Sequence, residues 1–353
     1  MGGKAMRRLA QQAARAECAG RLIIPRTRSD RMASQRATLK GEYVNPIPSL
    51  FARRPFWDGL SPSQRALHLM RSCLERHPTW IFTGAAGALA HGMDVPHGLN
   101  FPLRAIIERG SVPHEGPCLR FTRRAEAASE VIEGCRVAPL RMCVSDCLRG
   151  ASFPMGLAVA DAALRHTGVS AQDMMSHLNR RGCRRHGIQR ALLIASHADA
   201  RAENGGESFA RALMIEEGFM LPDLQVEFAD PVDPSHRFRV DQFWRLPHGG
   251  GMIGELDGKE KYRNPGMMQG GSTLGTVLDE RRRESRLTLL GYPVLRYAFA
   301  DLLVPARFIK LLEAAGVPRS EDASREWWGS WLRATGRLRD LPLIRPAALA
   351  GDP

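Results

Sequence analysis

The order of helical and strand-like segments in the last third of the chain restricts the fold most strongly. The helical segments are Glu207–Glu217, Leu278–Leu290 and Ala306–Ala315, and the strand-like runs are Leu224–Phe228, Phe238–Trp244, Met252–Asp257 and Val294–Phe299. Gly218 and Gly291 follow the first two helices, at the position where glycine commonly ends a helix. The order α-β-β-β-α-β-α predicts an α/β domain with a mixed sheet flanked by helices.

Three acidic residues lie on two of these strand-like runs, and their spacing predicts that they converge. Side chains alternate between the two faces of a strand, so Asp241 would share a face with Phe243, and Glu255 would share one with Asp257. If the two strands are neighbours, the three carboxylates meet at adjacent strand ends. Glu207, near the start of the preceding helix, can add a fourth carboxylate.

Such a cluster of carboxylates points to a divalent cation. Neighbouring carboxylates resist joint ionisation unless a positive charge lies among them. Mg²⁺ prefers oxygen ligands and commonly binds one or two carboxylates together with substrate phosphate. The same ion can activate water and stabilise a phosphodiester under attack. The acids therefore predict metal-assisted hydrolysis of DNA, with Asp241, Glu255 and Asp257 as the metal ligands.

Each acidic residue also has a structural interpretation that the sequence leaves open. Asp241 can be a surface acid on an edge strand, and Glu207 can be a favourable acid in the first turn of a helix. Two acids on one face of an apolar strand, such as Glu255 and Asp257, are costly unless they have a partner.

The charge of the chain favours a polyanionic partner. The formal net charge is +13, and residues 1–40 hold ten Lys or Arg against only Glu17 and Asp30. Nucleic acid is the commonest partner of such a basic chain, so we expect DNA binding. The alternative is that an arginine-rich genome raises the charge without any nucleic-acid function.

Several classes of protein are disfavoured by the sequence. No apolar run approaches the roughly 18 residues of a membrane span, and no signal peptide is recognisable, so we expect a cytoplasmic protein that does not bind membranes. Seven scattered cysteines without a CxxC motif argue against a disulfide framework and against zinc. Neither a P-loop nor a GxGxxG motif after a strand is present, so no small-molecule cofactor is expected.

The motifs from Glu207 to about Val304 resemble a known nuclease domain. They are Glu207-Ser208 opening a helix, Val240-Asp241 on a strand, Gly254-Glu255-Leu256-Asp257-Gly258-Lys259 with Lys261-Tyr262, then Glu280, Arg283, Glu284 and Leu287, and finally Gly291-Tyr292 before Val294-Leu295-Arg296. In order and spacing, this stretch resembles the Vsr-type PD-(D/E)xK domain that often ends actinobacterial proteins of the AbiEi antitoxin group.

The resemblance implies roles for individual residues. Asp241 and Glu255 would be metal-binding acids, and Glu207 would be the accessory acid on the first helix. The general motif has lysine two positions after the glutamate, where this chain has Asp257. Lys259 or Lys261 would then have to orient the attacking water or the phosphate.

The upstream half resembles the AbiEi-like portion of the same proteins more loosely. The matching stretches are Gly41-Glu42-Tyr43-Val44, the small-residue run ending at His91-Gly92, and Leu157 to Leu164. We therefore expect an α+β N-terminal region followed by an α/β restriction-endonuclease-like domain. The predicted segments are a basic arm or degenerate helix-turn-helix (1–40), an AbiEi-like α+β domain (41–200), a Vsr-like nuclease-fold domain (201–316) and a Trp-rich C-terminal extension (317–353).

Three functional hypotheses follow from the sequence. The first is a Mg²⁺-dependent DNA nuclease. The second is a non-catalytic DNA-binding antitoxin or repressor that keeps the nuclease fold as a scaffold, with a cognate toxin or its operator as the partner. The third is an interaction module in which the acids are structural. Fold alone does not decide among them.

Overall fold

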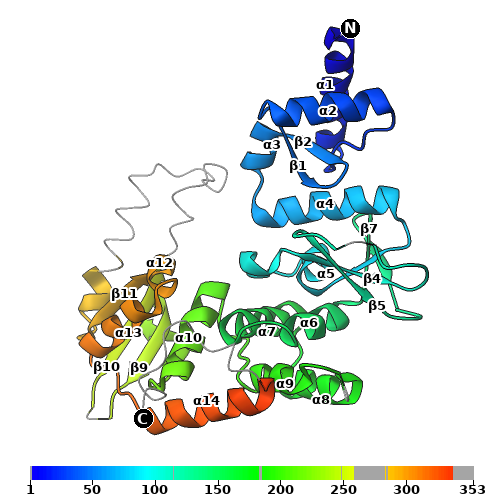
Figure 1. Cartoon of the computed structure of the whole chain (residues 1–353). Helices are drawn as coiled ribbons and strands as arrows, with labels where there is room; N and C mark the ends of the chain where they lie inside the picture. Colours follow the sequence, from blue (N-terminus) through cyan, green and yellow to red (C-terminus); the bar gives the residue numbers. More distant parts are fainter. Residues whose placement is uncertain are drawn as a thin grey trace, which may run out of the picture. The chain divides into compact units, whose positions relative to one another are not determined.

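The chain divides into two compact units, Met1–Ala151 and Ser152–Pro353, and each is described by itself. The computed structural model (Figure 1) describes residues 2–113, 115–182, 185–247, 249–257, 283 and 285–336. This division is coarser than the four predicted segments. Residues 1–40 and most of 41–200 belong to the first unit, while 201–316 and 317–353 belong to the second.

The first unit begins with two helices and a hairpin. Helices α1 (Gly2–Cys18) and α2 (Arg28–Leu39) precede the antiparallel strands β1 (Tyr43–Ile47) and β2 (Leu50–Arg53) (Figure 1). They share a small core of Leu9, Ala13, Ile23, Ala33, Ala37, Tyr43 and Phe51. The described part of the basic segment 1–40 is therefore folded mainly as helix and packs against the hairpin.

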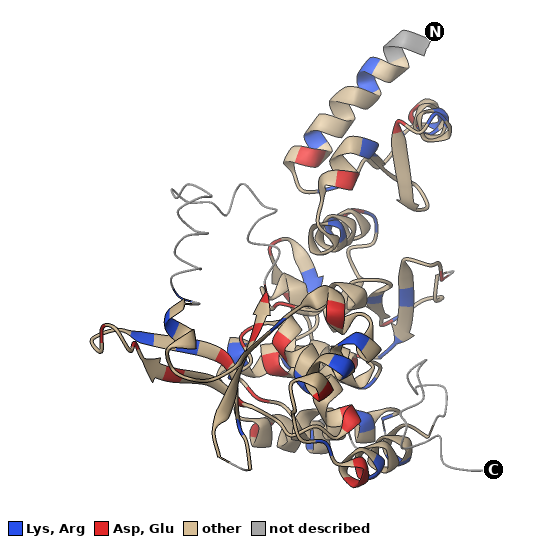
Figure 2. Ribbon diagram, turned by 90° about the vertical axis from the view of Figure 1, so that its left-hand side faces the viewer, with Lys and Arg blue, Asp and Glu red and all other residues tan. Residues whose placement is uncertain are grey.

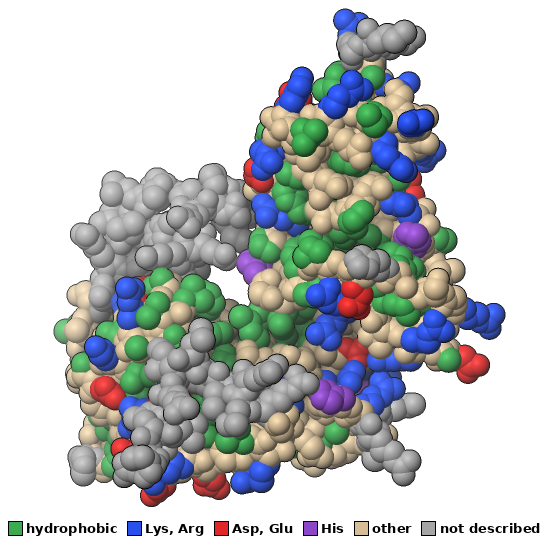
Figure 3. All heavy atoms as spheres, in the orientation of Figure 1, with side chains coloured by type: hydrophobic (Ala, Val, Ile, Leu, Met, Phe, Trp, Pro, Cys, Tyr) green, Lys and Arg blue, Asp and Glu red, His purple; other side chains and the backbone are tan. Residues whose placement is uncertain are grey.

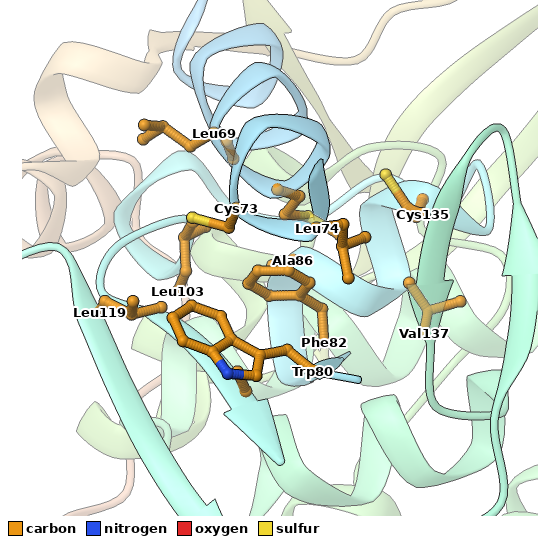
Figure 4. Close-up of a cluster of buried hydrophobic side chains, with 14 of the residues drawn as sticks. Leu69, Cys73, Leu74, Trp80, Phe82, Ala86, Leu103, Leu119, Cys135 and Val137 are labelled. Atoms are coloured by element: carbon orange, nitrogen blue, oxygen red, sulfur yellow. The ribbon is translucent and has the colours of Figure 1, made fainter. Parts of the chain in front are cut away.

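A five-stranded sheet forms the rest of the first unit, in the order β5-β4-β3-β7-β6. Its strands are β3 (Ile81–Thr83), β4 (Leu103–Ile107), β5 (Leu119–Arg123), β6 (Glu130–Ile132) and β7 (Cys135–Val137). The helices of this region are α3 (Arg54–Gly59), α4 (Pro62–Arg76), α5 (Gly84–Ala90) and α6 (Leu140–Leu148). Figure 4 shows Leu69 and Cys73 of α4 beside Phe82, Leu103 and Leu119 of the sheet in one apolar core.

The first residues of helix α4 determine where it begins. Ser61 and Pro62 predict a capped helix start, because serine accepts backbone hydrogen bonds there and proline suits the first turn. In the structure, the Ser61 side chain accepts from Gln64 N, and the Gln64 side chain accepts from Ser61 N. This reciprocal capping box fixes where the helix begins.

The second unit joins a group of helices to a mixed four-stranded sheet. Helices α7 (Phe153–Thr167), α8 (Ala171–Gly182), α9 (Ile188–Ser196) and α10 (Gly205–Glu217) come first. Strands β8 (Asp223–Ala229), β9 (Arg237–Arg245), β10 (Gly251–Asp257) and β11 (Val294–Ala298) follow, and then α12 (Phe299–Leu302), α13 (Pro305–Ala314) and α14 (Glu321–Thr335). The sheet order is β11-β10-β9-β8, with only the β10–β11 pair parallel. The predicted mixed sheet flanked by helices is therefore confirmed.

Two apolar cores cover the faces of this sheet. On one face Trp244 and Tyr297 pack with residues of α10 and α13. On the other face Phe243 and Ile253 pack around Leu287. Residues 283 and 285–288 are helical, and the rest of the helix predicted over Leu278–Leu290 lies partly outside the described residues.

The tryptophans of the predicted C-terminal extension belong to the packing of the second unit. Trp327, Trp328 and Trp331 are buried on α14. The ring centroids of Trp327 and Phe153 lie 4.7 Å apart, and the guanidinium of Arg190 lies 5.5 Å from the Trp331 ring. Helix α14 therefore covers α7 and α9 and contributes to the stability of the unit.

We expect Gly218→Ala to destabilise the protein far more than Gly168→Ala. Both glycines end helices with positive φ, +72° and +69°. A β-carbon at Gly218 would lie 2.1 Å from the Ser320 carbonyl oxygen, whereas at Gly168 it would meet no described atom within 4 Å. The left-handed conformation alone costs about 1–2 kcal/mol, and overlap adds about 1–3 kcal/mol. Urea unfolding measures both, and equal losses would contradict the predicted overlap.

Candidate functional site

Asp241 lies on β9, next to the strand β10 that carries Glu255 and Asp257. The antiparallel pairing places Phe243 opposite Ile253 and Gln242 opposite Gly254, and Asp241 and Glu255 are the next residues on the two strands. The predicted neighbourhood of the two strands is therefore present. The Oδ2 atom of Asp241 accepts a hydrogen bond from the backbone N–H of Leu256 at 3.1 Å.

The alternation of side chains is interrupted around Asp241. Val240 and Phe243 belong to the same apolar core, although strict alternation would place them on opposite faces. Gln225, which falls opposite Asp241 in the β8–β9 register, has a φ of +56°. The backbone irregularity at this position explains why the face of Asp241 does not follow from strand parity.

Glu207 is buried at the start of α10 and comes close to Asp241. Its carboxylate accepts hydrogen bonds from Glu203 N at 2.8 Å, from Gln225 Nε2 at 3.2 Å and from the Asn204 side chain. Burial raises the pKa of Glu207 to about 7, the negative charge of Asp241 contributes to the rise, and the hydrogen bond from Glu203 opposes it. The negative charge of Asp241 is therefore near enough to disfavour ionisation of Glu207.

We expect Glu207 to titrate near neutral pH and to make folding stability depend on pH. Because its pKa rises from 4.5 to about 7 on folding, the folded chain holds this proton more tightly than the unfolded chain. The resulting stabilisation is complete below about pH 4.5 and is lost as the pH rises to about 7. Urea unfolding across this range, compared with Glu207→Gln, measures it; an unchanged pH dependence in the variant would contradict the assignment.

Glu255 is held by two arginines. Its Oε1 atom lies 2.8 Å from Arg283, and its Oε2 atom lies 3.0 Å from Arg296 on the parallel strand β11. Arg296 also lies 3.4 Å from Asp257. Glu255 and Asp257 therefore both contact Arg296, as expected for two residues on the same face of a strand. These guanidinium groups supply the positive partner that a buried carboxylate requires.

Arg283, Arg296 and Gln225 are site residues that sequence reasoning missed or assigned differently. Helical spacing alone favours a pair between Arg283 and Glu280 or Glu284, which lie outside the described residues, whereas in the structure Arg283 binds Glu255. Arg296 lies directly opposite Glu255 in the parallel β10–β11 pair. The alternation of side chains along Val294–Ala298 could therefore have predicted that Arg296 shares a face with Glu255. Gln225 gave no comparable signal, because its positive φ is a feature of the backbone.

Two relations among the predicted acids are present in the described residues. The charge of Asp241 affects the pKa of Glu207, and Glu255 and Asp257 both contact Arg296. Within the described ranges, no group of three Asp, Glu, His or Cys side chains is arranged to hold a metal ion. Lys259 and Lys261 lie outside these ranges.

The donors at Glu207 and Asp241 fit a hard divalent cation in chemical type. Both offer carboxylate oxygens, and the raised pKa of Glu207 indicates a place where added positive charge is favourable. The amide of Gln225 is bound to Glu207 and orients it. This pair is therefore the best candidate for a metal site among the described residues.

Basic residues are distributed over both compact units (Figure 2). On the face seen in Figure 3, basic side chains are scattered among hydrophobic and other side chains in the region of the N-terminal helices. The exposed basic residues of the first forty positions are Arg7, Arg8, Arg15, Arg26, Arg28, Arg31, Arg36 and Lys40. No helix in the described part of the chain combines the length and the apolar character required to cross a membrane.

Comparison with known proteins identifies two relatives. They are the Uncharacterized protein MT2308 of Mycobacterium tuberculosis strain CDC 1551 / Oshkosh and the Uncharacterized protein Rv2248 of strain ATCC 25618 / H37Rv. Each is 29% identical over 149 residues, which cover 42% of this chain and 49% of the relative. The chain thus spans about half the length of the curated relatives it matches. No protein-family model and no solved structure matches the chain.

Proposed function

We propose that this protein is a DNA-associated protein whose second unit contains a metal-dependent nuclease-type site of the PD-(D/E)xK class. The element order supports the proposal: α10, then the antiparallel strands β8, β9 and β10, then β11 parallel to β10. The first helix contributes Glu207 and the middle strand β9 contributes Asp241, whose charge affects the pKa of Glu207. This is the arrangement implied by the resemblance to Vsr-type domains at the ends of AbiEi-group proteins.

The observation that carries the proposal is the interaction between Glu207 and Asp241. Burial raises the pKa of Glu207 to about 7, and the negative charge of Asp241 adds to the rise. These two residues would hold the cation, and Mg²⁺ bound there would supply Lewis-acid stabilisation of a phosphodiester. Glu255 would enter the site from the adjacent strand position, and Lys259 or Lys261 would orient water or phosphate.

DNA is the proposed substrate because the chemistry and the charge agree. A carboxylate-held cation suits the hydrolysis of phosphodiesters, and the net charge of +13 attracts a polyanion. The exposed arginines of α1 and α2 can contact phosphates without reading sequence.

Incubation of the purified chain with supercoiled plasmid tests the nuclease directly. We expect nicked circles to accumulate with Mg²⁺ and to be absent with EDTA. DNA binding at low salt with no cleavage in Mg²⁺ or Mn²⁺ would contradict the proposed activity.

A second candidate function is that of a non-catalytic DNA-binding antitoxin or repressor. The specific observation in its favour is that both carboxylate oxygens of Glu255 bind arginines, an arrangement that also serves a stable scaffold. DNA affinity that falls steeply with salt, together with absent cleavage, would support it. A cognate toxin would then be the expected protein partner.

A further inference from the structure

A charged network in the first unit lies apart from the carboxylates discussed above. Asp146 on α6 is 6% exposed and accepts a hydrogen bond from Thr83 Oγ1 at 2.7 Å. Arg124, just after β5, lies 3.3 Å from Asp146 Oδ1, and Arg149, at the end of α6, pairs with the same oxygen atom. One buried carboxylate therefore binds two guanidinium groups.

Arg104 on β4 places a third guanidinium beside this network. It pairs directly with Thr83 across the β3–β4 ladder, so the two side chains lie on the same face. A β-carbon added at Gly84 or at Gly150 would lie 3.4 Å from atoms of the Arg104 side chain. The side chain of Arg104 therefore runs along the backbone at these two glycines.

The charges of Arg104 and Asp146 both affect the pKa of the Cys147 thiol. Burial raises the pKa of Cys147 to about 12, Asp146 adds to the rise, and Arg104 opposes it. No side-chain hydrogen bond or ion pair joins Arg104 to any of the residues that the structure describes. Arg124 and Arg149 thus bind the Asp146 carboxylate, while the Arg104 guanidinium lies beside Gly150 near the end of α6 without an acidic partner in the described part of the fold.

We propose that Arg104, Arg124 and Arg149 form a binding site for a phosphate group. Guanidinium groups bind phosphate oxygens through paired, charge-assisted hydrogen bonds. Asp146 holds Arg124 and Arg149 in place before the ligand arrives, which lowers the entropy lost on binding. The phosphate belongs either to a nucleic-acid backbone or to a free phosphate ester, since both present the same oxygens. This site does not depend on the nuclease proposal.

The test compares Arg104→Ala with Arg123→Ala in the full chain. Arg123 is also exposed and on the same sheet, but it stands three residues after Arg120, the register partner of Arg104, and so faces the other way. Calorimetry measures binding of inorganic phosphate, and fluorescence anisotropy measures binding of a short single-stranded oligonucleotide. We expect Arg104→Ala to weaken phosphate binding at least about tenfold and Arg123→Ala less than about twofold.

The two arms of the experiment separate the sources of the phosphate. Loss of both ligands in Arg104→Ala, with phosphate displacing the oligonucleotide, supports a nucleic-acid backbone. Loss of phosphate binding alone supports a free phosphate ester. Arg104→Lys keeps the charge but not the paired donors, so it should also weaken phosphate binding. Equal effects of Arg104→Ala and Arg123→Ala, or no saturable phosphate binding by the unmodified chain, would overturn the proposal.

Discussion

Replacement of Asp241 by alanine is expected to lower the rate of Mg²⁺-dependent plasmid nicking at least about 100-fold. Asp241 and Glu207 are the two carboxylates that the fold brings together, and removal of one leaves the cation with half of its proposed protein ligands. A metal ion supplies several kcal/mol of transition-state stabilisation, and each 1.36 kcal/mol changes the rate about tenfold. Agarose-gel quantification of nicked circles over time measures the rate.

The control for this prediction is Asp223→Ala. Asp223 is an exposed acid on the same sheet, where it pairs with Arg245 at 2.9 Å. Its removal changes the net charge equally and should leave the rate within about twofold of the original, because exposed ion pairs contribute little. Asp241→Asn keeps an oxygen acceptor for Leu256 N–H. Loss of nicking in this variant would therefore not result from loss of that hydrogen bond. Undiminished nicking by Asp241→Ala would show that Asp241 is not a ligand of the catalytic cation.

Replacement of Arg211 by alanine is expected to lower the free energy of unfolding by about 3–5 kcal/mol. Arg211 on α10 lies 2.8 Å from Asp161 on α7, and the exposed fractions of the two side chains are 8% and 0%. Arg211 also donates to the His197 carbonyl at 2.8 Å. Without the guanidinium, Asp161 would stay buried with no cationic partner among the described residues and would keep only weaker donors such as Asp199 N–H.

Urea unfolding measures this loss, and Arg325→Ala is its matched control. Arg325 lies in the same unit and pairs with Glu321 at 2.9 Å, but the side chains are 55% and 69% exposed. Its removal should cost less than about 1 kcal/mol. Similar losses in the two variants would show that the Asp161–Arg211 pair does not stabilise the packing of α7 on α10.

The sequence predicted α10 and the four strands of the second unit because each has a local signal. Gly218 marks the end of α10, and the alternating runs near residues 224, 240 and 253 become β8, β9 and β10. The parity of Glu255 and Asp257 also holds, since both reach Arg296. Patterns with a period of two or 3.6 residues were enough for these elements.

The contacts of the acidic residues could not be predicted from the sequence, because they depend on features that leave no local sequence pattern. The charge of Asp241 affects the pKa of Glu207, and the irregular backbone opposite Asp241 at Gln225 is visible only in three dimensions. The arginines that bind Glu255 come from positions 28 and 41 residues further along the chain. Strand parity predicts which side chains share a face, but it does not predict which partner reaches them.

The most direct test of the central claim is binding of Mn²⁺, a spectroscopically visible substitute for Mg²⁺, followed by electron paramagnetic resonance. We expect the unmodified chain to bind Mn²⁺ more tightly as the pH rises through about 7, because Glu207 loses its proton there. Glu207→Gln and Asp241→Asn should each weaken binding at least about tenfold, and Asp223→Asn should not. Equal Mn²⁺ affinity in the unmodified chain and in the Glu207→Gln, Asp241→Asn double variant would contradict a cation site at these two carboxylates.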